Sequence, residues 1–436
     1  MSNKALFQAI SMLLLVPLMV EASSQPPKAA EPAQIQGQTL TGELPVTLES
    51  LIDVALQKNP GIQSSLRMVE ARRRRIPQAK ALPDPTLTFG WAGDPVPFKV
   101  QRGDPSSYRS FQAMQEIPLG GKRGLRAEIA EKESDAAWWE YEDARRRLVA
   151  DVKTAYYDYV YYQKALEITR KNQDLLQKLA KIAEARYQVG KGMQADVLRS
   201  HVELSRLRQR ITVLEQQKRT AQARINTLLF RDPETPLPRP AGFESARLER
   251  GLDELYKLAR ENDTELQRQR QLIERGQTAV QLARKEYVPD LAVGYMFQNR
   301  PGMPEMHGAT FSFNIPIFYK SKQQEMVKEA QLELASTERG RDDRLTKLNF
   351  ELKEQYLMAK ASEELVELFE QGVVPQSSLA LESSMAAYQV GTVDFLTVIT
   401  NFTTVLDYEV EYYRERSNLQ MALARLEPLV GVELTK

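Results

Sequence analysis

Few side chains in this sequence have the types and spacing needed for catalysis. The 436 residues include no cysteine and only two histidines, His201 and His307. Thiol catalysis, disulfides and cysteine-based zinc sites are therefore excluded, and little imidazole is left for acid–base chemistry. Adjacent carboxylates such as Asp342 and Asp343 lie in a strongly charged stretch with no histidine or apolar pocket signal beside them. Since the sequence has no glycine-rich nucleotide loop and no Ser/His/Asp grouping, we expect that the protein is not an enzyme and binds no cofactor.

Soft metal ligands gather at one place. Met296, Met303, Met306 and His307 fall close together, and thioether and imidazole groups suit monovalent copper. Their spacing is irregular and the segment has the composition of a surface loop. We therefore interpret them as ordinary residues in and beside the predicted hairpin loop and predict no metal site.

The overall composition indicates long polar helices. The hydrophobic fraction is 42%, the charged fraction is 27% and the mean hydropathy is −0.45, so many residues must face water. The formal net charge of +1 gives no reason to expect a nucleic acid partner.

The N-terminus has the pattern of a secretory signal peptide. Lys4 precedes an apolar run that ends at Val20, and small residues end at Ala22, so we predict a signal peptide over 1–22. A retained anchor helix is the alternative, but Pro17 and the short apolar length argue against it. No cysteine follows that would carry a lipoprotein anchor. Residues 23–45, rich in Pro, Gln and Ala, are predicted to be a disordered leader.

A Tyr-Gln-Val-Gly sequence occurs twice, each time between two long helical stretches. The residues are Tyr187, Val189 and Gly190 in the first copy and Tyr388, Val390 and Gly391 in the second. Tyr-x-x-Gly between helices is typical of the tip of a helical hairpin, where glycine ends the first helix. Self-similarity at such a long period indicates a duplicated unit. We predict repeat 1 over 46–231, a linker over 232–249 and repeat 2 over 250–434.

Each predicted repeat carries a β-hairpin, over 86–117 and over 290–315. Large apolar residues alternate with small or polar ones along the strands, although less cleanly from Arg109 to Ile117. The large residues are Leu87, Phe89 and Trp91, then Leu291, Val293, Tyr295 and Phe297, then Phe311, Phe313 and Ile315. Such alternation is typical of a transmembrane β-barrel, so we predict that these side chains face lipid. A soluble sheet packed on helices is the alternative. Four strands cannot close a barrel, so the membrane interpretation requires a homotrimer with a 12-stranded barrel.

Long helical hairpins over 122–229 and 320–430 follow the strands. The stretch from Lys122 to Tyr187 would reach roughly 100 Å as one helix, which no compact domain needs. Apolar residues recur along it at the heptad spacing of side-by-side helices, from Leu148 to Leu166. The predicted fold class is mainly α with a small β part, in which the hairpins form a trimeric α-barrel.

With these elements, the chain from about Leu48 to Leu434 resembles the outer-membrane efflux protein family, the TolC-like trimeric exit ducts. The resemblance rests on the two tips, on Asp196-Val197-Leu198 after the first tip, on Leu-Pro-Asp at 82–84 and on Ile-Pro-Leu-Gly-Gly-Lys-Arg at 117–123. The last motif is similar to the subgroup that serves heavy-metal export pumps. The family resemblance implies a periplasmic α-barrel, an outer-membrane β-barrel, and tips that dock onto a periplasmic adaptor bound to an inner-membrane pump.

In several members of that family, acidic residues after the second tip ring a closed periplasmic entrance. Here the matching positions hold Thr397 and Thr400, and Asp394 lies on the same helical face. We hypothesise that these three residues line the constriction and that Asp394 favours cations there. The alternative is that Asp394 only caps the helix that begins near Phe395.

We therefore expect a homotrimeric outer-membrane channel that passively conducts small substrates, either metal ions or drugs. The expected partners are a periplasmic adaptor, an inner-membrane pump of the resistance-nodulation-division (RND) type and outer-membrane lipid, with no nucleic acid. One alternative is the exit duct of a type I secretion system, which passes polypeptide. An alternative from another class is a soluble periplasmic coiled-coil scaffold.

Overall fold

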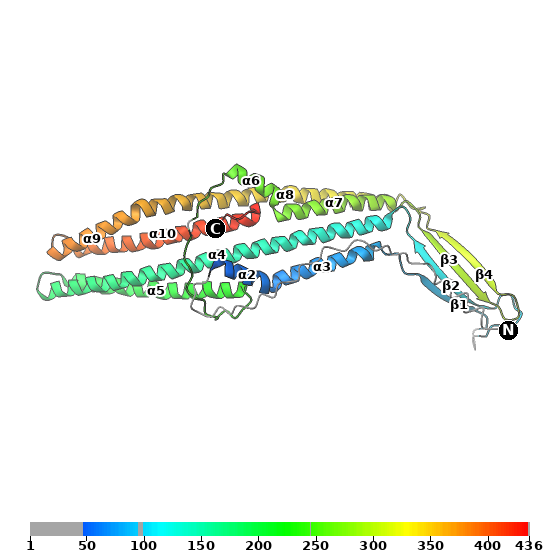
Figure 1. Cartoon of the computed structure of the whole chain (residues 1–436), viewed down its shortest axis with the longest axis horizontal. Coiled ribbons are helices and arrows are strands. Elements are labelled where there is room, and N and C mark those ends of the chain that lie inside the picture. Colours follow the sequence, from blue (N-terminus) through cyan, green and yellow to red (C-terminus); the bar gives the residue numbers. More distant parts are fainter. Residues whose placement is uncertain (1–46, 95–98, 245, 435–436) are drawn as a thin grey trace. The chain divides into compact units, whose positions relative to one another are not determined.

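The computed structural model describes residues 47–94, 99–244 and 246–434. Within them, most of the chain is helical and a single four-stranded antiparallel sheet accounts for the named strands (Figure 1). This confirms the predicted fold class, mainly α with a small β part. The predicted signal peptide over 1–22 and leader over 23–45 lie outside the described residues.

The N-terminal half has two short helices, two strands and a long helical hairpin. Their bounds are α2 Leu48–Lys58, α3 Pro60–Lys80, β1 Thr86–Ala92, β2 Tyr108–Ile117, α4 Lys122–Gln188 and α5 Gln194–Leu228. The break between α2 and α3 has a local cause. Asn59 accepts a hydrogen bond from the Gly61 N–H, and Pro60 stands at the first helical position, where its missing N–H costs nothing.

The C-terminal half has the same order of elements. Their bounds are α6 Leu252–Asn262, α7 Thr264–Lys285, β3 Leu291–Asn299, β4 Met306–Phe313, α8 Gln323–Leu368, α9 Val374–Val390 and α10 Phe395–Val430. Whereas α4 runs without a break for 67 residues, a π-helical turn at Phe369–Val373 separates α8 from α9. Pro375 follows this turn and cannot donate a backbone hydrogen bond, which accounts for the altered ladder.

The sheet has the strand order β1-β2-β3-β4, so β1 and β4 are its edges. Phe89, Phe111, Phe297 and His307 stand opposite one another across the four strands and therefore share one face. Ile315, predicted as a strand residue, lies beyond the end of β4 at Phe313. Continued pairing would place Ile315 opposite Pro289, which has no N–H to donate.

The helices pack in a side-by-side order around α4. α3 and α5 contact one side of α4, α7 and α10 contact the other, α8 packs against α7 and α10, and α9 packs against α10 (Figure 1). Along α4, the apolar residues of the predicted heptad seam are buried at Leu148, Val152, Ala155 and Tyr159. No helix in the described part of the chain is both long enough and apolar enough to cross a membrane.

Candidate functional site

The two tips end their helices in the same way. Gly190 and Gly391 both have positive φ angles, 73° and 84°. In each tip the residue after glycine donates its N–H to a carbonyl five residues earlier, from Lys191 to Arg186 at 2.8 Å and from Thr392 to Ala387 at 3.0 Å. Only glycine adopts this left-handed backbone without strain, which explains the glycine at both positions.

The aromatic residues of the two tips have opposite surroundings. The Tyr187 side chain is exposed, at 46%, whereas Tyr388 is 3% exposed. The Tyr388 ring packs against Phe395, with 5.3 Å between ring centroids, inside the core that α4, α5, α9 and α10 share near the tips. Val189 and Val390 are both exposed. Thus the first tip presents its tyrosine at the surface and the second presents valine alone.

Arg186 connects the two tips. Its Nη1 donates to the carbonyl oxygens of Tyr388 and Gln389, and its Nη2 donates to the carbonyl of Lys191 in its own tip. The guanidinium also lies over the Tyr388 ring, 4.7 Å from the centroid. One side chain of α4 therefore holds the last turn of α9 and covers its tyrosine.

The environment of Tyr388 disfavours its ionisation. Burial raises the pKa of the Tyr388 hydroxyl, and the negative charge of Asp196 raises it further, while the Arg186 guanidinium acts in the opposite direction. The hydroxyl therefore stays protonated at neutral pH, and this neutral ring is what packs beneath Arg186.

The helices that leave the two tips begin differently. Asp394 caps α10, accepting hydrogen bonds from the Thr397 N–H at 2.9 Å and the Thr397 hydroxyl at 2.6 Å. Those two bonds lower the pKa of the Asp394 carboxyl, so it is ionised at neutral pH. Asp394, Thr397 and Thr400 are all exposed and share one face of α10. At the first tip, Met193 holds the equivalent capping position and offers no side-chain bond.

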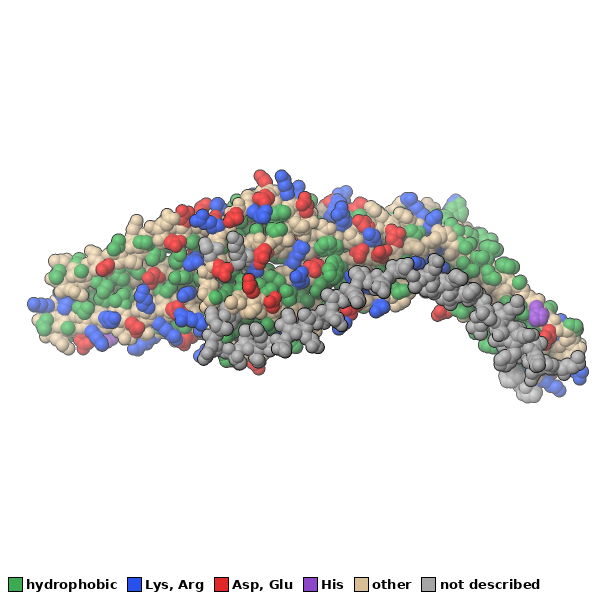
Figure 2. Space-filling view, in the orientation of Figure 1, with side chains coloured by type: hydrophobic (Ala, Val, Ile, Leu, Met, Phe, Trp, Pro, Cys, Tyr) green, Lys and Arg blue, Asp and Glu red, His purple; other side chains and the backbone are tan. Residues whose placement is uncertain are grey.

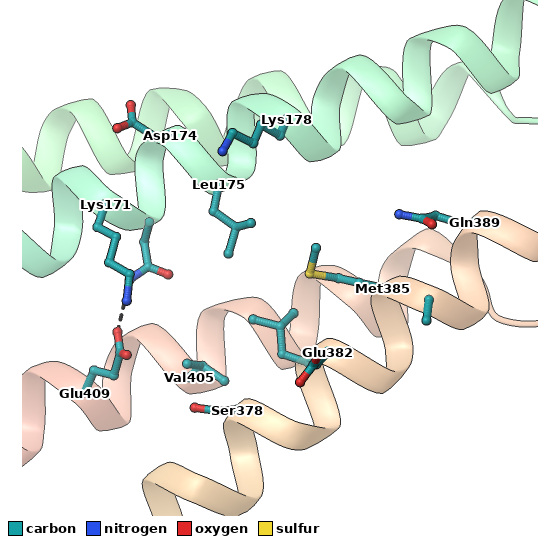
Figure 3. Close-up of a pocket in the computed structure, with 13 residues that line it drawn as sticks. Lys171, Asp174, Leu175, Lys178, Ser378, Glu382, Met385, Gln389, Val405 and Glu409 are labelled. Atoms are coloured by element: carbon teal, nitrogen blue, oxygen red, sulfur yellow. Dashed lines mark hydrogen bonds between the residues drawn. The ribbon is translucent and has the colours of Figure 1, made fainter.

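A cleft of about 660 Å³ lies between the two hairpins, a few turns from the tips. Leu175 of α4 and Met385 of α9 project into it from opposite walls (Figure 3). Asn172 Nδ2 donates to Glu409 Oε2 at 3.2 Å across its far end. Arg186 connects α4 with α9 nearer the tip, and the contact of Asn172 with Glu409 connects α4 with α10, so two polar contacts join the hairpins on either side of the cleft.

One face of the sheet, called the apolar face, carries most of the large apolar side chains together with Arg109, Gln115 and His307, and the other face carries mainly small and polar residues. All the residues predicted to face lipid that lie within the strands fall on the apolar face: Leu87, Phe89, Trp91, Leu291, Val293, Tyr295, Phe297, Phe311 and Phe313. Phe89, Phe311 and Phe313 are largely exposed. Figure 2 shows hydrophobic side chains gathered over this end of the molecule, near β3 and β4. This face has no partner within the described chain.

The sheet is joined to the helices by a buried lysine. Lys122, the first residue of α4, is 1% exposed, and its Nζ donates to the Val288 carbonyl at 2.8 Å and to Asp290 Oδ1 at 2.9 Å. Its ammonium also pairs with Glu286 at 3.3 Å, while the Leu119 N–H donates to Asp290. The start of α4 is thereby fixed to the segment that leads into β3.

Sequence reasoning did not identify Arg186, and it interpreted Lys122, with Arg123, as a candidate for lipid head groups, whereas Lys122 is buried and paired within the chain. A signal for Arg186 exists, because the two tips match closely but the second has Ala387 in its place. Lys122 gives no such signal, since its partner Asp290 lies 168 residues away in the sequence.

The sequence matches a known protein family over most of its length. The family model described as outer membrane efflux protein matches in two segments, residues 51–229 and 255–432. Among characterised proteins, nodulation protein T of Rhizobium leguminosarum bv. trifolii is 25% identical over 236 residues, which cover 50% of this chain and 50% of that protein. That match therefore spans half the length of the relative.

Several solved structures of outer membrane and channel proteins share the fold. The transmembrane channel protein CusC superposes with a TM-score of 0.76 at 15% identity, covering 94% of this chain and 98% of that one. The outer membrane protein VceC of Vibrio cholerae gives 0.75 at 15% identity, with 89% and 96% covered. The open state of the outer membrane channel MtrE of Neisseria gonorrhoeae gives 0.72 at 16% identity, with 89% of each chain covered.

Proposed function

Since the chain belongs to the outer membrane efflux protein family, we propose that it is the exit duct of a tripartite efflux assembly. It conducts small substrates, metal ions or drugs, passively to the outside from an RND-type pump and its periplasmic adaptor. The observation that carries this proposal is the position of the unpartnered apolar sheet face and the helical tips at opposite ends of α4. With 67 residues, α4 separates them by roughly 100 Å.

A closed channel requires several copies of the chain, and we propose a homotrimer. β1 and β4 are unpaired edges, and three sheets joined edge to edge would form the 12-stranded barrel. The helical edges favour the same head-to-tail arrangement. α3 and α5, on one edge, carry 13 Lys and Arg against 4 Asp and Glu. α8 and α9, on the other, carry 7 against 12, so the two edges have opposite charge.

Cell fractionation tests the channel proposal. We expect the full chain in the outer membrane fraction, and as a trimer by analytical ultracentrifugation in detergent. Reversing two exposed charges on the basic edge, Arg74→Glu with Arg75→Glu, should weaken the trimer, and high salt should weaken the wild-type trimer. Recovery as a monomer in the soluble periplasm would instead favour the scaffold alternative.

The type of pump is tested separately. A deletion strain should become more sensitive to metal ions or drugs if the duct serves an efflux pump. A strain that keeps its resistance but no longer secretes a polypeptide would identify the type I secretion alternative.

The adaptor is proposed to dock on the exposed residues of the tips. These are Tyr187, Val189 and Gly190 in the first tip and Val390 and Gly391 in the second. Tyr388, predicted with them, is buried and supports the second tip from beneath. Val189→Asp and Val390→Asp should each reduce cross-linking to the adaptor in cells, whereas Tyr388→Phe should not.

Asp394, Thr397 and Thr400 are proposed to line the periplasmic constriction. Capping and charge can be separated, because asparagine caps helices as well as aspartate does. Asp394→Asn should therefore keep α10 folded and lower the cation selectivity of the reconstituted channel. Unchanged selectivity in this variant would leave Asp394 with the capping role alone.

A further inference from the structure

The segment between β4 and α8, Ile315 to Lys322, exposes a run of large apolar side chains. Ile317 is 74% exposed and Phe318 78%, and Ile315 and Tyr319 are exposed as well. The segment is ordered by its own turns: the Ile317 N–H donates to the Ile315 carbonyl at 2.9 Å, and the Lys322 N–H donates to the Phe318 carbonyl at 3.1 Å. The exposure is therefore a property of a built turn.

The matching segment of the N-terminal half is partly buried. There, Ile117 to Arg123 also follows a strand and begins with Ile-Pro, but Pro118 and Lys122 are buried. Lys320, at the position that corresponds to Lys122, is exposed. Linking a strand to a helix at this place thus does not in itself require an exposed apolar turn.

Positive charge surrounds the exposed turn. Lys320 and Lys322 are exposed, and the last turn of α7 adds Arg284 and Lys285. The rings of Tyr287 and Tyr319, 6.4 Å apart, bring the end of α7 beside the turn. Within the described chain, none of the four cations forms an ion pair.

The neighbouring carboxylates are already engaged. Glu286 pairs with Lys122 and Arg126, and Glu325 pairs with Lys328. The four cations therefore form a site with uncompensated positive charge, next to apolar side chains that extend the apolar face of the sheet.

We propose that this turn, together with Arg284 and Lys285, binds the head group of an anionic phospholipid. Ile317 and Phe318 enter the boundary between acyl chains and head groups, Tyr319 lies at the level of the head groups, and the lysines contact the phosphate. The inference rests on the proposed function, which places the apolar face of the sheet in a lipid bilayer.

A neighbouring copy of the chain is the other candidate for covering the turn. Its adjoining edge would be the one formed by α3 and α5, which carries 13 Lys and Arg against 4 Asp and Glu. Four unpaired cations would meet more positive charge there, whereas an anionic phospholipid neutralises them.

The test uses the full chain, purified from membranes in a non-ionic detergent and titrated with dioleoylphosphatidylglycerol or dioleoylphosphatidylcholine. Native mass spectrometry counts the bound lipids. We expect the wild type to prefer phosphatidylglycerol, and Lys320→Gln with Lys322→Gln to lower its apparent affinity roughly 30-fold, from the usual effect of two basic residues near an anionic head group. The matched control, Lys58→Gln with Lys353→Gln, removes two exposed and unpaired lysines elsewhere and should leave the affinity unchanged.

A second variant tests the apolar part of the site. Phe318→Ala should weaken the binding of both lipids while keeping the preference for the anionic one. The inference is overturned if the Lys320/Lys322 variant binds phosphatidylglycerol like the wild type, or if the control falls as far. It is also overturned if that variant dissociates the oligomer with lipid binding intact, because a neighbouring copy would then be the occupant. Recovery of the chain in the soluble periplasm overturns this inference and the proposed function together, whereas an outer-membrane trimer without lipid preference overturns the inference alone.

Discussion

Tyr187 and Tyr388 occupy the same position in the two Tyr-Gln-Val-Gly tips, yet the first is half exposed and the second is buried beneath Arg186. The same contrast occurs at the other end of α4. Lys122 is enclosed with Asp290 and Glu286, and Lys320, its counterpart, is exposed beside Phe318. At each end, one half of the chain encloses a residue of the other half. The matching residue is left exposed.

This asymmetry shows how two similar halves can take different roles. Arg186 has Ala387 as its counterpart, and Gly120 and Gly121 have Phe318 and Tyr319. These replacements distinguish the closed tip and junction, where a residue is buried against the other half, from the open ones. The closed ones hold the two halves together, and the open ones supply surfaces for the adaptor and for lipid in the proposed function.

The largest effect is expected at the sheet junction. Lys122→Met removes a buried cation and leaves the Asp290 and Glu286 carboxylates without it, which should lower the free energy of unfolding by about 3–5 kcal/mol. Lys320→Met, the same change at the exposed counterpart, should leave stability unchanged. Thermal unfolding followed by circular dichroism in detergent measures both. Equal losses in the two variants would contradict the contrast between the junctions.

A smaller effect is expected at the tips. Arg186→Ala removes the hydrogen bonds to the Tyr388 and Gln389 carbonyls, a net loss of about 1–2 kcal/mol, so amide exchange in 386–391 should become roughly tenfold faster. Lys181→Ala, which changes an exposed residue of the same helix, is the control. Exchange in 386–391 that does not respond to Arg186→Ala would show that the second tip is stable without this contact.

The helix caps offer a way to make the tips more alike. Met193 gives α5 no side-chain cap, so Met193→Asp should stabilise the start of α5 by about 0.5–1 kcal/mol and slow amide exchange at 195–196. Asp394→Ala should have the opposite effect at the start of α10, since it removes the bonds from Thr397. Hydrogen–deuterium exchange mass spectrometry measures the starts of α5 and α10 in one experiment. Amide exchange at 195–196 that is unchanged in Met193→Asp would mean that the first tip cannot adopt capping geometry.

The smallest effect is a pH dependence confined to the second tip. Because burial raises the pKa of Tyr388, the stability linked to its neutral form is complete below the ordinary tyrosine pKa of about 10 and is lost as the pH rises through the higher folded value. Urea unfolding between about pH 8 and pH 11 should therefore show a loss that Tyr388→Phe reduces and Tyr187→Phe does not. An equal reduction by both variants would contradict different surroundings for the two tyrosines.

The sequence by itself determined most of the elements and several of their ends. Gly190 and Gly391 end helices because the left-handed backbone there suits glycine, and Asn59-Pro60 separates α2 from α3 by local capping. The strands follow from period-two alternation, which also assigned the apolar face correctly. These features could be predicted because each depends on residues within a few positions of one another.

Only the tertiary structure decided which of the two tips and which of the two strand-to-helix junctions has its key residue buried. Arg186 reaches Tyr388 across 202 residues and Lys122 reaches Asp290 across 168, while β4 ends at Phe313, two positions before its pairing with β3 would reach Pro289. No local pattern encodes such pairs. Whether a buried charge or tyrosine is tolerated depends on the group that packing brings against it, and that group is fixed only when distant segments of the chain meet.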